Sequence, residues 1–352
     1  MKKILIDLKV VGGNQYNGLY NYCFNLGKSL LKYNCHSFEL FYYLPKKKFG
    51  IFGSTIQYVA QHSIDKYFKF ATSKYSLWHA TNHISWYKPF SKKVKFLFTI
   101  HDLNFFLEQP TKKASNARKL KLIQKRVDRA CHVTFVSNFA YQQACEYLKI
   151  QNKPYSIIYP GCSLVSNPIE PETPPFIPNT PFLFSIGLVQ TRKNFHVLIP
   201  LLLNNNYLLI IAGLNNFDYK NVILETALKY KVNDRIIFTG AISENEKVWY
   251  YKNCLAFFFP SIAEGFGLPV IEAMHFGKPV FLSKHTSLPE IGGKMAYYFD
   301  NFEPSVMVQN FANGMHHYNT YLPSTKIKKW ANNFTYENTA KAYSELYKKL
   351  IL

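Results

Sequence analysis

Residues 260–279 read PSIAEGFGLPVIEAMHFGKP, and the rest of the chain is arranged around this stretch. It predicts a strand end, a glycine-rich turn and a short helix. Pro269 suits the first helical position, because its missing N–H would be unpaired there, and Gly277 suits the residue just past the helix. Two carboxylates, Glu264 and Glu272, flank the helix start. Since the free N–H groups of a helix N-terminus bind anions, the stretch favours a ligand with both phosphates and sugar hydroxyls.

Length and composition indicate a two-domain protein. The 352 residues are long for one core, and 48% hydrophobic and 17% aromatic content is ample for packed interiors. No segment reaches the roughly 18 uncharged apolar residues that a membrane span needs. The start, MKKILIDLKVVGG, is like a secretion signal, but Asp7 and Lys9 interrupt it, which favours a buried strand. Six scattered cysteines without a CxxC pair indicate core thiols in a reducing compartment.

The net charge of +21 is concentrated in the first half of the chain. Residues 1–165 carry 25 Lys and Arg against 7 Asp and Glu, whereas residues 166–352 carry 17 against 14. A basic half-molecule fits nucleic acid, an anionic membrane surface or an acidic substrate. A genome-wide lysine bias is the alternative, but it would not explain why only one half is so basic.

The first half alternates strands and helices. A strand at Lys3–Lys9 leads into a loop with Gly12 and Gly13, and then apolar residues recur at helical spacing. This order is typical of a phosphate-binding α/β unit, although the loop lacks the dinucleotide fingerprint and could simply make a tight turn. Further strands are predicted at 38–44, 77–80, 95–100, 133–136 and 157–159, with a helix at 117–129.

Histidines follow two of these strands. His101 and Asp102 come directly after strand 95–100, while His79 and His83 lie at the end of strand 77–80. Ligands of open α/β sheets bind outside the carboxyl ends of strands, so the His101–Asp102 pair is well placed to face a cleft. We expect His79 and His83 to be structural, although their roles stay open.

The predicted helix at 117–129 is basic and amphipathic. Such a helix can rest on anionic lipid headgroups. An ordinary solvated face is the alternative.

A proline-rich stretch separates the two halves. Residues 164–180 hold five prolines, which indicates a semi-rigid connector. Beyond it the alternation restarts, with strands predicted at 182–186, 207–212, 235–239 and 255–259 and helices at 195–203 and 222–232. A Ser243–Glu246 capping box opens the next helix. Two consecutive βαβα halves predict two Rossmann-like domains with a cleft between them.

Two cations stand at a predicted helix start in the second half. Arg192 and Lys193 lie in Gly187–Asn194, between the first strand and the first helix, with little anionic charge nearby in sequence. A charge-assisted contact to phosphate is worth about 1.5–3 kcal/mol, more than an exposed salt bridge returns. The motif therefore favours phosphate binding over plain surface charge.

Together these motifs resemble the retaining glycosyltransferases of family 4, nearly from end to end. The carriers are EGFGLPVIEAM, GLVQTRKN, Phe238-Thr239-Gly240, Ser287-Leu288-Pro289-Glu290, TIHDL and the terminal Trp330…Tyr343 pattern. The resemblance implies the GT-B fold, α/β, with two Rossmann-like domains facing each other across a cleft. We expect an acceptor-binding domain at 1–165, a linker at 166–180, a nucleotide-sugar-binding domain at 181–330, and a C-terminal helix at 331–352 that packs back on the first domain.

The resemblance also implies residue roles. Glu264 would face hydroxyls of the donor sugar and Glu272 the nucleotide ribose; carboxylates suit both, because they accept from vicinal hydroxyls. The catalytic set would be His101, Asp102 and Glu264. The donor diphosphate would be held by Gly13, Arg192, Lys193, Phe266, Gly267 and Leu268. The nucleotide would contact Glu272, Gly187, Thr239, Gly240 and Ala241.

One departure from the family pattern concerns the phosphate loop. Many members carry an arginine right after its first glycine, whereas this chain has Leu188 there, and Arg192 would compensate, as in the Arg-Lys-Asn subgroup common among mannosyltransferases. The chain has no Asp-x-Asp motif, so we expect no metal and no cofactor. The resemblance further implies retention of configuration, with front-face attack.

The leading hypothesis is a cytoplasmic retaining transferase on the inner face of the cell membrane that builds a surface polysaccharide. Its partners would be a nucleotide-sugar donor, best guessed as GDP-mannose, a glycan or lipid-linked acceptor, and the anionic membrane surface. A UDP-sugar donor is the first alternative. An epimerase or phosphorylase of the same fold is the second. A nucleic-acid-binding protein is the third, but the chain lacks aromatic-interleaved basic motifs, and we expect no nucleic acid.

Overall fold

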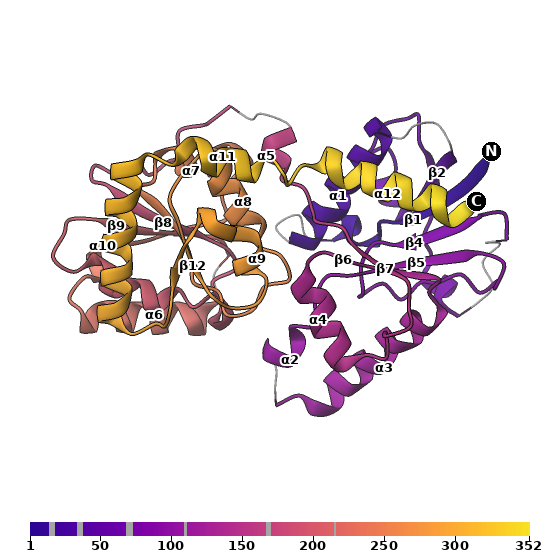
Figure 1. The fold of residues 1–352 in the computed structure, drawn as a ribbon, viewed down its shortest axis with the longest axis horizontal. Coiled ribbons are helices and arrows are strands. Elements are labelled where there is room, and N and C mark those ends of the chain that lie inside the picture. Colours follow the sequence, from indigo (N-terminus) through magenta and orange to yellow (C-terminus); the bar gives the residue numbers. More distant parts are fainter. Residues whose placement is uncertain (14–17, 34–37, 68–72, 109–110, 167–169, 215) are drawn as a thin grey trace. The chain divides into compact units, whose positions relative to one another are not determined.

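The computed structural model describes residues 1–13, 18–33, 38–67, 73–108, 111–166, 170–214 and 216–352. The chain divides into two compact units (Figure 1). Unit 1 comprises Met1–Ser163 and Thr335–Leu352, and unit 2 comprises Leu164–Phe334. The division therefore falls just before the expected linker. Within the described ranges no helix is both long and apolar enough to cross a bilayer.

Unit 1 is a parallel sheet in the order β3-β2-β1-β4-β5-β6-β7. All its strands except β3 were predicted from the sequence. The strands are β1 (Lys2–Asp7), β2 (Phe38–Leu44), β3 (Gln57–Ala60), β4 (Leu77–Ala80), β5 (Lys95–Ile100), β6 (His132–Phe135) and β7 (Tyr155–Ile157). The helices are α1 (Gly18–Tyr33), α2 (Phe105–Glu108), α3 (Lys113–Arg129), α4 (Asn138–Tyr147) and, from the far end of the chain, α12 (Tyr336–Ile351). The strand order reverses direction between β1 and β4, which marks the topological switch point where such sheets bind ligands.

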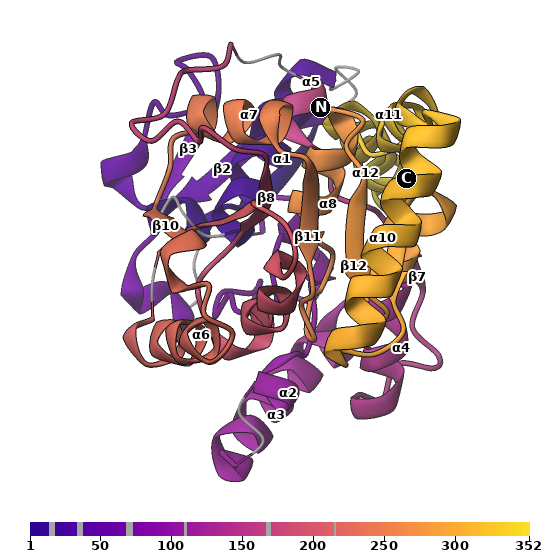
Figure 2. The same cartoon turned by 90° about the vertical axis from the view of Figure 1, so that its left-hand side faces the viewer.

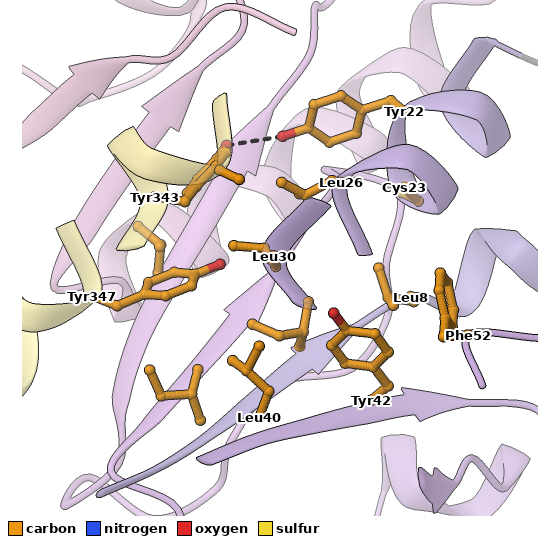
Figure 3. Packing of buried hydrophobic residues seen from close by; sticks show 14 of the residues in the cluster. Leu8, Tyr22, Cys23, Leu26, Leu30, Leu40, Tyr42, Phe52, Tyr343 and Tyr347 are labelled. Atoms are coloured by element: carbon orange, nitrogen blue, oxygen red, sulfur yellow. Dashed lines mark hydrogen bonds between the residues drawn. The ribbon is translucent and has the colours of Figure 1, made fainter. Parts of the chain in front are cut away.

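Helix α12 belongs to unit 1 and packs against α1. It is the yellow helix beside α1 in Figure 1. Its buried residues join one hydrophobic core with α1 and the sheet, which includes Leu26, Leu30 and Tyr42 (Figure 3). From α12 the core receives Tyr336, Ala340, Tyr343, Leu346 and Tyr347. The C-terminal residues of the chain are therefore part of the first unit's fold.

Unit 2 is a second parallel sheet, in the order β10-β9-β8-β11-β12-β13. Its strands are β8 (Phe182–Ile186), β9 (Leu208–Ala212), β10 (Ile236–Gly240), β11 (Ala256–Phe259), β12 (Val280–Ser283) and β13 (Tyr297–Phe299). A short helix, α5 (Ser163–Ser166), stands at the division between the units. The further α-helices of unit 2 are α6 (Phe217–Lys229), α7 (Glu244–Asn253), α8 (Leu268–His275), α9 (Leu288–Gly292), α10 (Pro304–Tyr321) and α11 (Ser324–Ala331). Helix α10 lies against β13, and Figure 2 shows it on the β12 side of the sheet. The switch point falls between β8 and β11, which carry the two predicted donor motifs.

Several predicted boundaries differ from the structure. The helix predicted at 195–203 is a 3₁₀ helix, Phe195–Leu202, with Pro200 inside it. The helix predicted at 117–129 begins four residues earlier, at Lys113. The C-terminal helix, expected at 331–352, begins five residues later, at Tyr336, and the chain returns to unit 1 at Thr335.

Candidate active site

The strand–turn–helix motif of unit 2 has the predicted local structure. After β11 the chain turns and α8 begins at Leu268, with Pro269 in its first turn and Gly267 as N-cap. Gly267 has φ 115°, in the left-handed region, and a Cβ there would lie 3.0 Å from Leu288 Cδ2. Only glycine meets both conditions without strain. The turn therefore brings the N-terminus of α8 next to the Glu264 loop.

The Glu264 carboxylate is the centre of a buried polar cluster. Its Oε1 atom lies 2.6 Å from Lys193 Nζ, 3.2 Å from Arg192 Nη1 and 2.6 Å from Ser261 Oγ, all three of which donate to it. The side chains of Lys193 and Glu264 are only 8% and 12% exposed. Burial raises the pKa of Glu264, but Lys193 and Arg192 outweigh it and hold that pKa below its usual value. The carboxylate is therefore ionised at neutral pH.

This cluster forms because β8 and β11 are neighbours in the sheet. The loops after two adjacent parallel strands leave from the same edge, so the loop with Arg192 and Lys193 meets the loop with Glu264. A turn of 3₁₀ helix, Thr191–Lys193, carries the two cations. Little anionic charge lies near these two cations along the sequence, as expected. In the folded chain, however, the Glu264 carboxylate lies beside both of them.

The loop after β12 fixes the backbone of Glu264. The backbone N–H of Glu264 donates to Thr286 Oγ1 at 3.1 Å. Ser287 Oγ donates to the carbonyl oxygens of Glu264 and Phe266 at 3.1 and 2.8 Å. Thr286 adopts a left-handed conformation with φ 55°, which is rare for a β-branched residue. The structure thus holds a strained residue next to the candidate catalytic carboxylate, as strained residues often lie at functional sites.

Glu272, four residues after Leu268 on α8, forms a second buried cluster. Its Oε1 atom accepts from Lys247 Nζ at 2.9 Å, and its Oε2 atom accepts from Tyr251 OH at 2.9 Å. Lys247 also pairs with Glu244 at 2.8 Å. Burial lowers the pKa of Lys247, but its two carboxylate partners outweigh burial and raise that pKa overall. Glu272 therefore has two oriented donors before any ligand arrives.

The other predicted nucleotide-binding residues follow strands of unit 2. Gly187 ends the β8 turn with φ 150°, and a Cβ there would lie 3.0 Å from Lys193 Cε, so this glycine lets the loop approach the lysine closely. Thr239 and Gly240 end β10, and Ala241 is exposed just after it. Gly240 accepts a hydrogen bond from Gly213 N at 2.7 Å. All four lie at the carboxyl edge of the same sheet as Glu264 and Glu272.

The three residues predicted to contact the diphosphate at α8 lie at the helix start. Gly267 and Leu268 open the helix, where N–H groups have no intrahelical partner. Phe266 is buried, and its ring packs against Phe334 with centroids 5.9 Å apart. Phe266 therefore offers backbone rather than side chain to a ligand.

In unit 1, His101 follows β5, the strand beside β4, at the carboxyl edge of the sheet. Its Nε2 lies 2.9 Å from the Thr81 carbonyl oxygen and its backbone N–H donates to His83 Nδ1 at 3.3 Å. The Tyr22 ring meets the imidazole edge-on, with centroids 4.6 Å apart. Burial and then His83 lower the pKa of His101 to about 4. A neutral imidazole that donates from Nε2 to Thr81 leaves Nδ1 as the acceptor.

Asp102 and Gly13 are occupied in local turns. Asp102 Oδ1 accepts from Asn104 N at 3.0 Å, just before α2. The Gly13 N–H donates to the Val10 carbonyl oxygen at 2.9 Å, so binding a diphosphate with this group would require the turn to open. The rest of the predicted glycine loop, residues 14–17, lies outside the described residues.

His79 is structural, as expected. It is fully buried, with Nδ1 2.6 Å from Tyr347 OH and Nε2 2.8 Å from Thr99 Oγ1. Burial lowers its pKa to about 3. His83 instead contacts the backbone of His101, which makes it part of the candidate site.

Sequence reasoning missed several polar residues that complete the clusters. Those in unit 2 are Lys247, Tyr251, Ser261 and Thr286; in unit 1, Asp7 ends β1 fully buried and accepts from Ser85 Oγ. Asp7 is the last residue of an apolar strand, and Asp102 comes two residues after one. A carboxylate at the end of an apolar strand is therefore the sequence signal by which Asp7 could have been predicted. Over the described part of the chain, no three His, Cys, Asp or Glu side chains gather as metal ligands would.

Comparison with known proteins gives matches in both halves. Residues 19–165 match the model of "Glycosyltransferase Family 4", and residues 167–308 match that of "Glycosyl transferases group 1". The serotype-specific mannosyltransferase WbdA of Escherichia coli is 35% identical over 119 residues, which cover 32% of this chain and 15% of WbdA. The O-antigen chain mannosyltransferase B of Escherichia coli is 26% identical over 218 residues, or 55% and 54% of the two chains. The chain therefore spans about half or less of these relatives.

Two solved structures resemble the whole chain. Sucrose-phosphate synthase of Thermosynechococcus elongatus has a TM-score of 0.72 at 16% identity, and the matched parts cover 99% of each chain. Anabaena HepE, solved with UDP and glucose, has a TM-score of 0.71 at 16% identity, with 99% of this chain and 100% of HepE covered. These likenesses confirm the predicted GT-B fold class with its two Rossmann-like units.

Proposed function

Because the chain belongs to the glycosyltransferases of family 4, we propose that it moves a sugar from a nucleotide-sugar donor to a glycan or lipid-linked acceptor. The observation that supports this most directly is the Glu264 cluster. An ionised carboxylate, two cations and the N-terminus of α8 stand together at one sheet edge. That combination suits a ligand with hydroxyls and phosphates side by side.

In this proposal the roles divide along the ligand. Glu264 accepts hydrogen bonds from hydroxyls of the transferred sugar, and Glu272 accepts from the ribose. Lys193 and Arg192 neutralise the diphosphate together with the first N–H groups of α8. As the bond to the anomeric carbon breaks, negative charge builds on the leaving phosphate, so donors already in place stabilise the transition state more than the ground state.

The reaction is proposed to be retaining and independent of a metal or cofactor. Retention rests on membership of the family. Metal independence rests on the sequence, which has no Asp-x-Asp motif to hold a metal at the diphosphate. In unit 1, His101 would stand near the reacting sugar, with its pKa lowered so that the ring is neutral at physiological pH.

The donor is proposed to be GDP-mannose and the product a surface polysaccharide. Two observations support this: the Arg192-Lys193-Asn194 motif, and relatives named as mannosyltransferases of O-antigen synthesis. A UDP-sugar is the alternative, favoured by the likeness to HepE, which was solved with UDP and glucose. We place the acceptor at the cytoplasmic face of the membrane, where the basic unit 1 would meet anionic lipid.

The test is a donor screen. Purified protein is incubated with GDP-mannose, UDP-glucose and UDP-galactose, and the released nucleoside diphosphate and the thermal shift are both measured. We expect turnover with GDP-mannose and none with Glu272→Gln, whose circular dichroism stays that of the wild type. Turnover with a UDP-sugar alone would overturn the choice of donor, and no binding or turnover with any of the three would overturn the proposal.

Product analysis separates a transferase from an epimerase or phosphorylase of the same fold. A transferase joins the sugar to an added acceptor, such as a mannosylated lipid, and releases free sugar only by slow hydrolysis. Rapid release of a free sugar or sugar phosphate without acceptor would favour the other two activities.

A further inference from the structure

A buried lysine holds the carboxylate to which the ribose is assigned. Lys247 Nζ lies 2.9 Å from Glu272 Oε1 and 2.8 Å from Glu244 Oε2, and its side chain is only 8% exposed. Tyr251 donates to the other oxygen of Glu272. We propose that Lys247, with Tyr251 as its helper, is a positioning residue that presents the Glu272 carboxylate to the ribose of the nucleotide. The inference rests on the proposed function, because it takes Glu272 as the ribose-binding group.

Helix geometry explains why these two donors reach the same carboxylate. Lys247 and Tyr251 are four residues apart on α7, so their side chains leave from one face of that helix. Glu272 lies on α8, the helix that follows the donor motif. A capping box fixes the first turn of α7, since Ser243 Oγ accepts from Glu246 N at 3.1 Å and the Glu246 side chain accepts from Ser243 N at 2.7 Å. Lys247 follows directly and is therefore anchored.

The donors leave room for a ligand. A carboxylate offers about four lone-pair positions on its two oxygens, and Lys247 and Tyr251 each use one. The remaining positions can accept from two vicinal hydroxyls. Ribose hydroxyls are neutral, so they cannot compensate a buried negative charge, and the ammonium group of Lys247 does so before the nucleotide binds.

The role predicts a dependence on the ribose hydroxyls that a merely structural lysine would not produce. The binding of GDP and of UDP is measured by calorimetry, together with their 2′,3′-dideoxy forms. The wild type is expected to bind one of the two nucleotides about tenfold or more tightly than its dideoxy form. Lys247→Met is expected to weaken the ribose form roughly tenfold and to leave the dideoxy form within about twofold, which collapses that ratio.

Three further variants isolate the effect. Lys252→Met removes an exposed lysine of the same helix and should leave both affinities unchanged. Lys247→Arg keeps the charge and should restore most of the ratio. Tyr251→Phe removes only a hydroxyl from a buried ring, so it folds readily and should lower the ratio in the same direction by a smaller factor.

The outcomes separate this inference from the proposed function. If the wild type binds neither GDP nor UDP, the proposed function fails and this inference falls with it. If the wild type discriminates ribose from dideoxyribose and Lys247→Met and Tyr251→Phe do so equally well, the inference alone is wrong. A loss that is equal for both nucleotide forms would also overturn it, because it would indicate damage to the fold rather than to the orientation of Glu272.

Discussion

Lys193 Nζ donates to Glu264 Oε1 across 2.6 Å, although 71 residues separate the two in sequence. The contact joins the loop after β8 to the loop after β11. The lysine also stands 4.4 Å from the centre of the Phe259 ring, an arrangement that favours a cation. The pair links the two motifs that resemble the family, and both motifs supply charge to one place.

Replacement of Glu264 by glutamine tests the catalytic role of that carboxylate. The variant keeps the shape and removes the negative charge, so the fold should survive while donor turnover falls by a factor of about 100 or more. Turnover is measured by nucleotide release, and folding by circular dichroism. Glu225→Gln, at an exposed position on α6, serves as the matched control. Turnover of Glu264→Gln within threefold of the wild type would show that Glu264 has no part in the chemistry.

Replacement of Lys193 by methionine should affect stability as well as activity. The change leaves the Glu264 carboxylate buried with a single cation, Arg192, and such a loss costs about 1–3 kcal/mol of unfolding free energy. Urea unfolding measures that cost, and Lys284→Met, at a 56% exposed side chain, is the control. Equal unfolding midpoints for Lys193→Met and the wild type would contradict the geometry.

The positions of strands β8 and β11 and the Glu264 motif could be predicted from the sequence, because each depends on local pattern. Apolar runs mark β8 and β11, and Gly267 with Pro269 marks the start of α8. The pairing of Lys193 with Glu264 depends instead on which strands are neighbours, and no local pattern records that. A prediction of the switch point between β8 and β11 would have supplied it.

Other features of the site could not be predicted from the sequence, for a different reason. Lys247 lies in a helix whose capping box was evident, but a lysine in a helix is most often solvated, whereas this one is buried and contacts Glu272 of α8. Gly13 was expected to offer its N–H to a phosphate, yet the turn that the glycine makes already uses that N–H for Val10. Both cases turn on hydrogen-bond partners, which sequence spacing does not specify.

The C-terminal helix should be held by a buried hydrogen-bond network. Tyr347 hydrogen-bonds to His79, and Tyr343 hydrogen-bonds to Thr99 and Tyr22. The hydroxyls of Tyr343 and Tyr22 lie 2.9 Å apart, and Figure 3 marks their hydrogen bond by a dashed line. Tyr347→Phe should cost about 1–3 kcal/mol of unfolding free energy, because it leaves His79 Nδ1 buried and unpaired. Thermal melts compare it with Tyr321→Phe, a tyrosine 71% exposed. The network is not important if both variants melt together.

Asp7 should give the fold an unusual pH dependence. Burial raises its pKa from 3.8 to about 6, although Ser85 and Lys9 oppose the rise. In that range the folded state binds a proton that the unfolded state has lost, so this group's contribution to stability falls as the pH rises from about 4 to 6, by at most roughly 3 kcal/mol.

The measurement for Asp7 is the difference between two curves of unfolding free energy against pH. Asp7→Asn mimics the protonated form. Its free energy of unfolding should therefore equal that of the wild type near pH 4 and exceed it increasingly as the pH rises to about 6. Glu264 has the opposite effect: its pKa is lowered in the folded state, so it adds stability at pH values above its pKa in the unfolded chain. This contribution is the same in the wild type and in Asp7→Asn, so it cancels in the difference between the two curves. A difference that is flat from pH 4 to 7 would disprove the prediction.

The basic surface of α3 should bind anionic lipid. Lys119, Lys121 and Lys125 are exposed on this helix, and each lysine near an anionic surface contributes about 1 kcal/mol of binding free energy. Reversal of all three to glutamate should therefore weaken binding to phosphatidylglycerol vesicles roughly 100-fold or more, and binding of the wild type should fall with added salt. Flotation with vesicles measures both effects. The matched control reverses three exposed lysines of unit 2, Lys229, Lys326 and Lys329, and changes the net charge equally. If both variants lose binding to the same extent, total charge rather than α3 governs the association.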